Sequence, residues 1–239
     1  MRYIYGPVPS RRLGLSLGVS LTPHKTCDFD CVYCQLGVTT LKSAERKEYF
    51  KVEEVVTEIA QWLANNAEKA NNLSFITFAG SGEPTLHPGL GGIIVSLRKM
   101  TSVPIAVITN ASLLQDPAVR REVAQADLIV PSLDAATEEV FQGVNRPLTG
   151  LRLQDILDGL AALRREYRGK IWLEVMVVKG INDDIGHARK LAELIERIRP
   201  DKIQLNSPVR YTAEAHVAAA DRKQLERIQE ILGDKCEII

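Results

Sequence analysis

The sequence predicts an α/β protein: a partial (β/α)6 barrel with a parallel sheet. Short apolar segments alternate with amphipathic segments along the 239 residues, and six such units can be counted. Strands that alternate with helices form right-handed βαβ units and therefore a parallel sheet. A complete eight-unit barrel takes about 250 residues. Six units therefore fit an open, partial barrel or a doubly wound sheet.

Six segments are predicted as strands of this sheet. Each is short, and several are apolar on both faces, as expected of a parallel sheet buried by its surroundings. In chain order they are residues 16–21, 74–79, 104–109, 128–133, 171–178 and 202–206.

Helices are predicted where apolar residues recur every three to four positions. One apolar stripe runs from Val52 to Leu63, and a second runs from Ile185 to Ile198. Leu225 and its apolar neighbours indicate a last helix near the end of the sequence.

We expect one domain over residues 1–239, with a core at 15–207 and a C-terminal helix and tail at 208–239. No repeat, low-complexity segment or interdomain linker divides the sequence. The longest irregular stretches are residues 21–51 and 134–150, and both follow predicted strands. Long loops at the carboxyl ends of strands are more often functional than structural, so we expect both at the active face.

Composition excludes several classes of protein. Hydrophobic residues make up 45% and charged residues 25%, which argues against disorder, collagen and coiled coils. Lys plus Arg and Asp plus Glu are 30 each, so a strongly basic nucleic-acid-binding domain is not expected. Residues 1–51 nevertheless hold eight Lys and Arg against four Asp and Glu.

We expect a cytoplasmic protein with no membrane partner. No apolar run approaches the ~20 residues that a membrane helix needs. The first residues carry Arg and Pro where a signal peptide would be apolar.

Three of the four cysteines, Cys27, Cys31 and Cys34, lie within eight residues, whereas Cys236 stands apart. Clustered cysteines in a cytosolic chain bind metal or do redox work more often than they form disulfides. Three thiolates at this spacing can hold a 4Fe–4S cluster and leave one iron without a thiolate. The spacing alone also permits a zinc site completed by His24 or Cys236, or unrelated buried cysteines.

The residues between the cysteines favour one of these alternatives. Residues 26–34 read TCDFDCVYC, with the aromatic Tyr33 directly before the third cysteine. This segment resembles the signature loop of the radical S-adenosylmethionine (radical SAM) superfamily, which also follows the first barrel strand. The resemblance implies a radical SAM core and a 4Fe–4S cluster on Cys27, Cys31 and Cys34. It also implies that the open iron chelates SAM and that the backbone of Tyr33 helps to seat the adenine.

A second segment, Gly80-Ser81-Gly82-Glu83-Pro84, follows the second predicted strand. Glycines allow the backbone to approach a ligand closely. The resemblance implies that this segment holds the methionine amino group of SAM, with Ser81 in place of the commoner glycine. We expect Glu83 to serve SAM binding rather than folding, because a buried carboxylate needs a partner and the ammonium would supply it. Taken alone, the segment would be a turn with a surface glutamate.

Polar residues at the ends of the later strands complete the predicted cofactor site. Such residues point into the mouth of a barrel, although Asn, Ser and Asp also cap turns. The resemblance implies ribose or methionine contacts at two positions, a supporting amide, a lysine for the SAM carboxylate and backbone near the adenine. The predicted cofactor-binding residues are Tyr33, Gly80, Gly82, Glu83, Asn110, Ser132, Asp134, Lys179 and Asn206. A solvated Lys179 is the alternative at that position, and Arg210 is a further candidate beside Asn206.

Three other segments narrow the resemblance. Residues 5–14 read YGPVPSRRLG, residues 81–86 read SGEPTL and residues 179–182 read KGIN. All three resemble the wyosine-synthase-like (tRNA-imidazoG synthetase-related) group of Fe–S oxidoreductases, and the resemblance covers nearly the whole chain. The pair Arg11 and Arg12 has a fork geometry suited to carboxylate or phosphate, or it is solvated charge at a turn.

One departure from that group concerns the cysteines. The tRNA enzymes that build the wyosine tricycle carry extra cysteines for a second cluster, whereas only Cys236 is left over in this chain. A tRNA substrate is therefore possible but not favoured.

The resemblance implies an enzyme that reductively cleaves SAM to a 5′-deoxyadenosyl radical, which abstracts hydrogen from an unidentified substrate. An electron donor such as flavodoxin or ferredoxin is the expected partner. The candidate substrates are a tRNA base, a small metabolite and, ranked last, a glycine on a partner protein. A non-catalytic zinc or iron–sulfur protein is the alternative, but it leaves the Gly-Glu-Pro segment unexplained.

Overall fold

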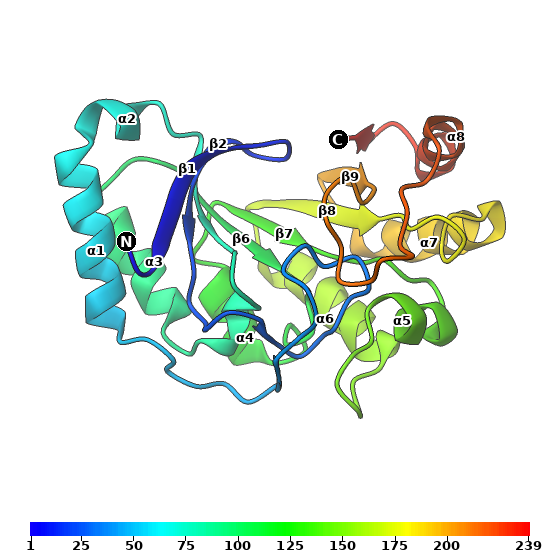
Figure 1. Ribbon diagram of the computed structural model, residues 1–239, viewed down its shortest axis with the longest axis horizontal. Helices are drawn as coiled ribbons and strands as arrows, with labels where there is room; N and C mark the ends of the chain where they lie inside the picture. Colours follow the sequence, from blue (N-terminus) through cyan, green and yellow to red (C-terminus); the bar gives the residue numbers. More distant parts are fainter.

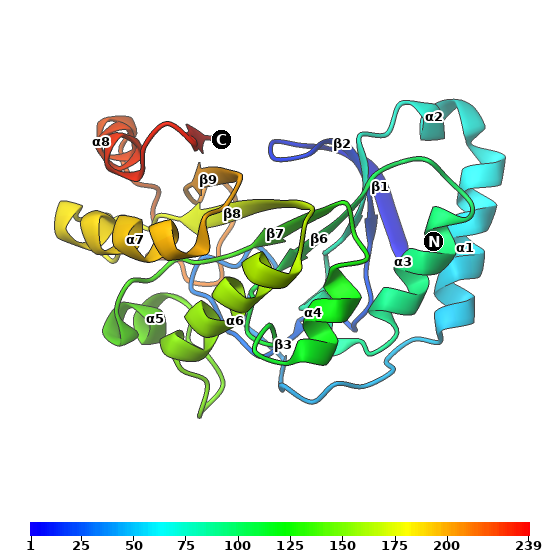
Figure 2. The same cartoon turned by 180° about the vertical axis from the view of Figure 1, so that it is seen from behind.

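One sheet of eight strands organises the chain, and the computed structural model describes all of residues 1–239 (Figure 1). The strand order is β1-β2-β5-β6-β7-β8-β9-β10. Helices cover the face of the sheet that is turned toward the reader in Figure 2. This arrangement is the predicted α/β fold with a mostly parallel, partially closed barrel.

All six predicted strands are present, and they are parallel to their neighbours in the sheet. They are β2 (Gly14–Val19), β5 (Phe75–Phe78), β6 (Ile105–Thr109), β7 (Leu128–Pro131), β8 (Lys170–Met176) and β9 (Lys202–Asn206). Because the strands are parallel, their carboxyl ends lie at one edge of the sheet, where the predicted site residues follow them.

The two edge strands of the sheet were not predicted. Strand β1 (Ile4–Ser10) pairs antiparallel with β2, and β10 (Cys236–Ile238) pairs parallel with β9. Strand β1 contains Pro7 and Pro9, which cannot donate to a neighbouring strand and are therefore confined to edges. Strand β10 has only three residues, too few for a pattern to be visible. Two further short strands, β3 (Thr26–Cys27) and β4 (Leu41–Lys42), pair with each other.

The helices begin and end where local chemistry requires it. Asp116, Thr137 and Asp184 each accept a hydrogen bond from a backbone N–H of the first turn that they precede. The predicted apolar stripes are confirmed in three of the helices. The helices are α1 (Val52–Asn65), α2 (Ala67–Asn71), α3 (Leu90–Arg98), α4 (Pro117–Val123), α5 (Glu138–Val144), α6 (Leu153–Glu166), α7 (Ile185–Ile198) and α8 (Arg222–Leu232). None of them is long and apolar enough to span a membrane.

Side chains of the strands alternate between two hydrophobic clusters. The larger cluster, with 49 buried residues, contains Val107 and Ile129 together with the apolar faces of the helices. The smaller cluster contains Ala106, Leu128 and Val130 on the other face of the sheet. No helix covers that face, and its apolar residues are instead covered by Leu13 from the turn between β1 and β2.

The turn between β1 and β2 also spans the open side of the barrel. The Arg12 side chain forms an ion pair with Glu174 on β8, and the Arg11 Nη2 atom donates to Asn206 Oδ1 at the end of β9 over 3.1 Å. In Figure 1 this turn extends from β2 toward β9. The polar contacts of Arg11 and Arg12, together with the packing of Leu13, therefore connect the β1–β2 turn to the rest of the sheet on the side of the barrel that strand pairing does not close.

Replacement of Leu13 by Ala is expected to lower the free energy of unfolding by about 2–3 kcal/mol, because it opens a cavity in a small cluster. Leu13 is 3% exposed. Urea unfolding measures the loss. Val95→Ala is the matched control, because Val95 is 39% exposed on α3 and should change stability by less than about 0.5 kcal/mol. Equal effects of the two substitutions would show that Leu13 is not part of the core.

Candidate active site

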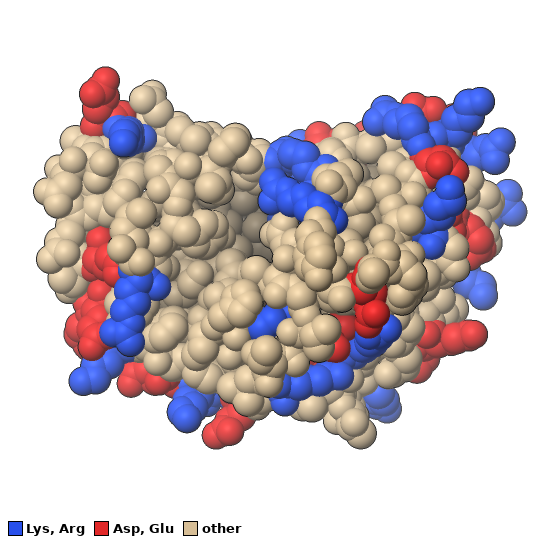
Figure 3. Space-filling model, viewed as in Figure 1, with Lys and Arg blue, Asp and Glu red and all other residues tan.

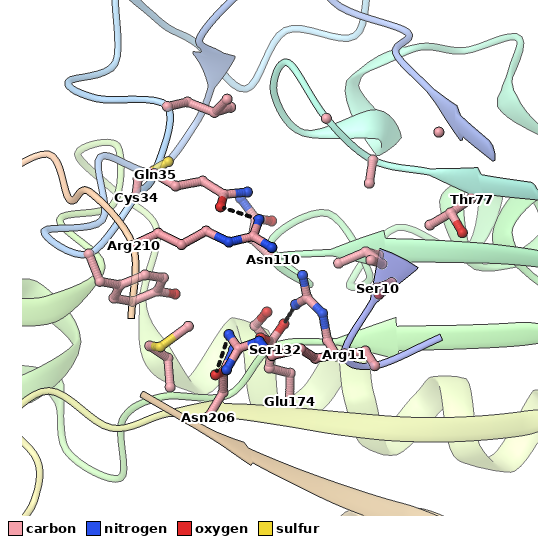
Figure 4. Close-up of a pocket in the computed structure, with 18 of the residues that line it drawn as sticks. Ser10, Arg11, Cys34, Gln35, Thr77, Asn110, Ser132, Glu174, Asn206 and Arg210 are labelled. Atoms are coloured by element: carbon pink, nitrogen blue, oxygen red, sulfur yellow. Dashed lines mark hydrogen bonds and ion pairs between the residues drawn. The ribbon is translucent and has the colours of Figure 1, made fainter. Parts of the chain in front are cut away.

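A cavity of about 590 Å³ opens at the carboxyl ends of the parallel strands. Its wall takes residues from the cysteine loop, from the segments after β5, β6 and β7, from the β1–β2 turn and from the segment after β9. Figure 3 shows the hollow near the middle of this face, with basic side chains at its edge. Figure 4 shows the residues that line it, drawn from segments far apart in the sequence.

The cysteine loop is held against the segment after β5 by backbone contacts. Thr26 and Gly82 form a parallel bridge, and the Glu83 N–H donates to the Thr26 carbonyl over 3.1 Å. A Cβ atom on residue 82 would lie 1.9 Å from that carbonyl oxygen. Glycine is therefore required at position 82 by the approach of the cysteine loop, rather than by the approach of a ligand alone.

The opposite side of the cysteine loop packs on the segment after α5. The Val32 N–H donates to the Val144 carbonyl over 2.9 Å, and the Leu148 N–H donates to the Asp28 carbonyl over 2.7 Å. Phe29 packs edge-on against a ring of α5, with 5.4 Å between ring centroids. The two long irregular stretches predicted at the active face are thus in contact with each other.

Amide groups are directed at two of the cysteine sulfurs. The Phe29 N–H donates to Cys27 Sγ over 3.4 Å, and Asn110 Nδ2 lies 3.6 Å from the same sulfur. Asn145 Nδ2 lies 3.6 Å from Cys31 Sγ. Hydrogen bonds of this kind stabilise thiolates and tune the clusters that thiolates hold.

Burial acts on these thiols in the opposite direction. It raises the pKa of Cys27 well above its ordinary value and raises the pKa of Cys31 to about 12. A bound metal centre removes this penalty because its positive charge deprotonates a coordinating thiol. No three His, Cys, Asp or Glu side chains converge tightly enough for a single metal ion. Three thiols on one loop, two of them with amide donors directed at their sulfurs, fit an iron–sulfur cluster.

Cys236 is not brought to this loop. It lies in β10 and packs in the larger hydrophobic cluster, and burial raises its pKa to about 12. The zinc alternative that used Cys236 as the fourth ligand therefore has no support in the fold.

Glu83 faces the cavity, and hydrogen bonds within the fold also hold its side chain; its role in SAM binding stays a prediction. It is 3% exposed, and its Oε1 accepts from the Thr85 N–H, the Thr85 hydroxyl and the Thr109 hydroxyl over 2.6–3.1 Å. Its Oε2 accepts from the Asn110 N–H over 2.8 Å. These donors join the end of β5 to the end of β6, so the Glu83 side chain links two strand ends even without a bound ammonium. Burial, reinforced by the nearby Asp28, raises its pKa to about 7.

Asp134 is satisfied by the protein in a similar way. Its carboxylate accepts from the Tyr33 hydroxyl, from Asn145 Nδ2 over 2.7 Å and from the Met176 N–H over 2.8 Å. Burial raises its pKa to about 6. Asp134 fixes the ring of Tyr33 between two of the cysteines, which is a positioning role.

The structure brings most of the predicted cofactor contacts to one cavity and leaves two outside it. Lining residues among them are Tyr33, Gly80, Gly82, Glu83, Asn110, Ser132 and Asn206, together with Cys27 and Cys34. Asp134 does not line the cavity. Lys179 does not line it either: its side chain is half exposed and pairs with Asp221 over 3.1 Å. The lysine therefore takes the solvated alternative, because the segment after β8 turns away toward α8.

Four residues of the site were missed by sequence reasoning. Asn145 binds Cys31, Lys25 and Tyr5 line the cavity, and Glu174 lines it from β8. Glu174 carried a visible signal, since it is the one acid within an apolar strand and a charge there must point into the barrel with a partner. Tyr5 carried no such signal in the sequence. Its ring lies over Gly18 of the neighbouring strand, where a Cβ atom would lie 2.0 Å from it, and a contact between two strands leaves no local pattern.

Comparisons with known proteins agree with this geometry. The sequence profile of the radical SAM superfamily matches residues 21–192. A UPF0026 protein of Methanocaldococcus jannaschii is 37% identical over 240 residues, which cover 100% of this chain and 73% of the relative. A protein named GTPase Obg from Brachyspira hyodysenteriae is 36% identical over 235 residues, 98% of this chain but only 34% of that relative. The chain thus spans about a third of that protein's length.

Solved structures give the same fold. TYW1 with a lysine-pyruvate adduct bound superimposes with a TM-score of 0.65 at 19% identity, over 91% of this chain and 72% of that chain.

The Glu83 carboxylate should make stability depend on pH. Its pKa rises from 4.5 to about 7 on folding, so the folded state holds the proton more tightly. The group destabilises the fold increasingly as pH rises from 4.5 to 7. Urea unfolding of the wild type and of Glu83→Gln, without SAM, should show the stability difference shifting by about 2–3 kcal/mol in favour of the variant between pH 5 and pH 8.

Gln lacks one of the two carboxylate oxygens at both pH values. The change in the stability difference between pH 5 and pH 8 therefore reports the ionisation of Glu83 alone. A stability difference that stays constant with pH would mean that Glu83 ionises normally in the folded chain.

Proposed function

This chain belongs to the radical SAM superfamily, and from that premise we propose that it cleaves SAM in the cavity at the strand ends and acts there on a second molecule. The superfamily consists of enzymes, and the cofactors of this chain are accordingly a 4Fe–4S cluster and SAM. We assign the cluster to Cys27, Cys31 and Cys34.

The observation that carries this proposal is the bridge between Thr26 and Gly82. It places the cysteine loop and the Gly-Ser-Gly-Glu segment on one cavity, although they are about fifty residues apart in sequence. A structural metal site would not require the second segment. A site for SAM requires both, because the cluster and the amino acid end of SAM must be held together.

The bound cluster and SAM supply one-electron cleavage of a carbon–sulfur bond and a hydrogen-abstracting radical. The chain's own residues position these groups. Glu83 Oε1 accepts three hydrogen bonds from the protein, whereas Oε2 accepts one. A carboxylate oxygen has room for a further donor, so Oε2 is the atom we assign to the SAM ammonium.

Asparagine amides hold the sulfurs in place around the cluster. Asn110 contacts Cys27 and Asn145 contacts Cys31, and each asparagine is fixed by a buried carboxylate. Apolar side chains, among them Leu36 and Ile108, also line the cavity. The expected reductant is a flavodoxin or ferredoxin.

Each of Cys27→Ala, Cys31→Ala and Cys34→Ala is expected to abolish the cluster. Anaerobic reconstitution should then give no brown chromophore, no bound iron and sulfide, and no 5′-deoxyadenosine from SAM with dithionite. Cysteine thiolates hold a 4Fe–4S cluster, and each substitution would leave only two of the three that we assign to it.

Cys236→Ala is the matched control, since that thiol is packed in the core. It should retain the chromophore and SAM cleavage. Loss of the cluster in this control, with the fold intact by circular dichroism, would contradict the assignment.

We propose that the substrate is not the tRNA base of wyosine synthesis. A second cluster has only Cys236 available, and that residue lies in β10 away from the cavity. Incubation of the reconstituted enzyme with SAM, dithionite, pyruvate and tRNA that carries the methylated guanine should give no tricyclic base on digestion and mass spectrometry. Detection of the tricyclic base would overturn this proposal.

A further inference from the structure

Several cationic side chains that line the cavity have no acidic partner. Four cationic side chains line it, Arg11, Arg12, Lys25 and Arg210, against the two acids Glu83 and Glu174. Only Arg12 has an acidic partner, Glu174. The other three cationic side chains form no ion pair with an aspartate or glutamate, although they line one cavity.

Neither Arg11 nor Arg210 has an aspartate or glutamate partner. Arg11 donates to Asn206 Oδ1 and to a main-chain oxygen of Ile239, the last residue of the sequence, each over 3.1 Å. Arg210 donates to Gln35 Oε1 over 3.2 Å. Figure 4 shows the two pairs, Arg210 with Gln35 and Arg11 with Asn206, on the wall of one pocket. A guanidinium has five N–H donors, so both retain donors for an anion.

The proposed cofactors do not neutralise these charges. SAM carries a sulfonium and an ammonium against one carboxylate, so it brings net positive charge into the cavity. Its single carboxylate can pair with only one of Lys25, Arg11 and Arg210. The iron and sulfide of a 4Fe–4S cluster would leave part of the thiolate charge uncancelled, and the net positive charge of SAM would balance the remainder. At least two cations on the cavity wall therefore remain for a further ligand.

The position of the two arginines relates them to the substrate side of the site. Arg210 contacts the residue next to Cys34, at the edge of the cysteine loop. Arg11 lies in the β1–β2 turn and reaches the end of β9. Glu83, to which we assign the SAM ammonium, lies after β5. The arginines thus come from other segments of the wall than the carboxylate that binds the amino acid end of SAM.

From this charge distribution we infer that the substrate carries a dianionic group, a phosphate monoester or a pair of carboxylates, bound by Arg11 and Arg210. The inference rests on the proposed function and adds the chemical class of the substrate to it. The planar guanidinium matches both oxyanions through paired N–H donors, which a lysine would not do.

The test measures anion binding to the cluster-loaded protein by titration calorimetry, with inorganic phosphate and malonate as probes at low, constant ionic strength. Arg11→Gln and Arg210→Gln remove one cation each, and both side chains are exposed enough for the fold to tolerate the change. Each should weaken binding by about tenfold or more, the loss expected for a charge-assisted pair. Arg197→Gln, an exposed arginine of α7 without an ion pair, is the matched control and should leave binding unchanged.

Binding of phosphate alone supports a phosphate ester, and binding of malonate alone supports a dicarboxylate. Binding of neither, or equal binding by the wild type and the Arg11→Gln, Arg210→Gln double variant, would overturn the inference. A parallel SAM titration separates the two proposals. SAM binding without anion binding contradicts only the substrate class, whereas absence of SAM binding contradicts the proposed function.

Discussion

Buried carboxylates at the carboxyl ends of the strands are the constraint on which the rest of the structure depends. Glu83 and Asp134 are almost inaccessible to solvent, and burial raises the pKa of both. Such groups are tolerated only where hydrogen-bond donors surround them. The donors come from neighbouring strand ends and from the cysteine loop: Asn110 for Glu83, and Met176 and Tyr33 for Asp134. Satisfying two acids therefore fixes the relative position of four strands and the loop.

The same network reaches the cysteines through two asparagines. Asn110 donates to the carboxylate of Asp28 over 2.6 Å and lies against Cys27. Asn145 donates to Asp134 and lies against Cys31. Each amide has two N–H bonds, so one asparagine can serve a carboxylate and a sulfur together. Fold stability and cluster geometry are coupled here, because a change at either asparagine disturbs both.

Zero net charge conceals an uneven distribution. Half of the arginines have acidic partners, and their charges cancel locally. In the β1–β2 turn, Arg12 is neutralised by Glu174 while its neighbour Arg11 is not. One short turn thus closes the open side of the barrel with a paired charge and presents an unpaired one to the cavity. Anion binding depends on which cationic side chains lack acidic partners, and the amino-acid composition does not give this information.

The sequence by itself determined the six parallel strands, the amphipathic helices and the cysteine and Gly-Ser-Gly-Glu motifs, because periodicity and spacing are local properties of a chain. Tertiary structure alone decided that the β1–β2 turn spans the open side of the barrel, that Asn145 lies against Cys31 and that Lys179 turns away from the cavity. Asn145 and Cys31 are 114 residues apart, and no local pattern encodes such a pair. Sequence also placed Asp134 correctly at a strand end. Whether its carboxylate faced a ligand or the protein depended on donors that only packing brought to it.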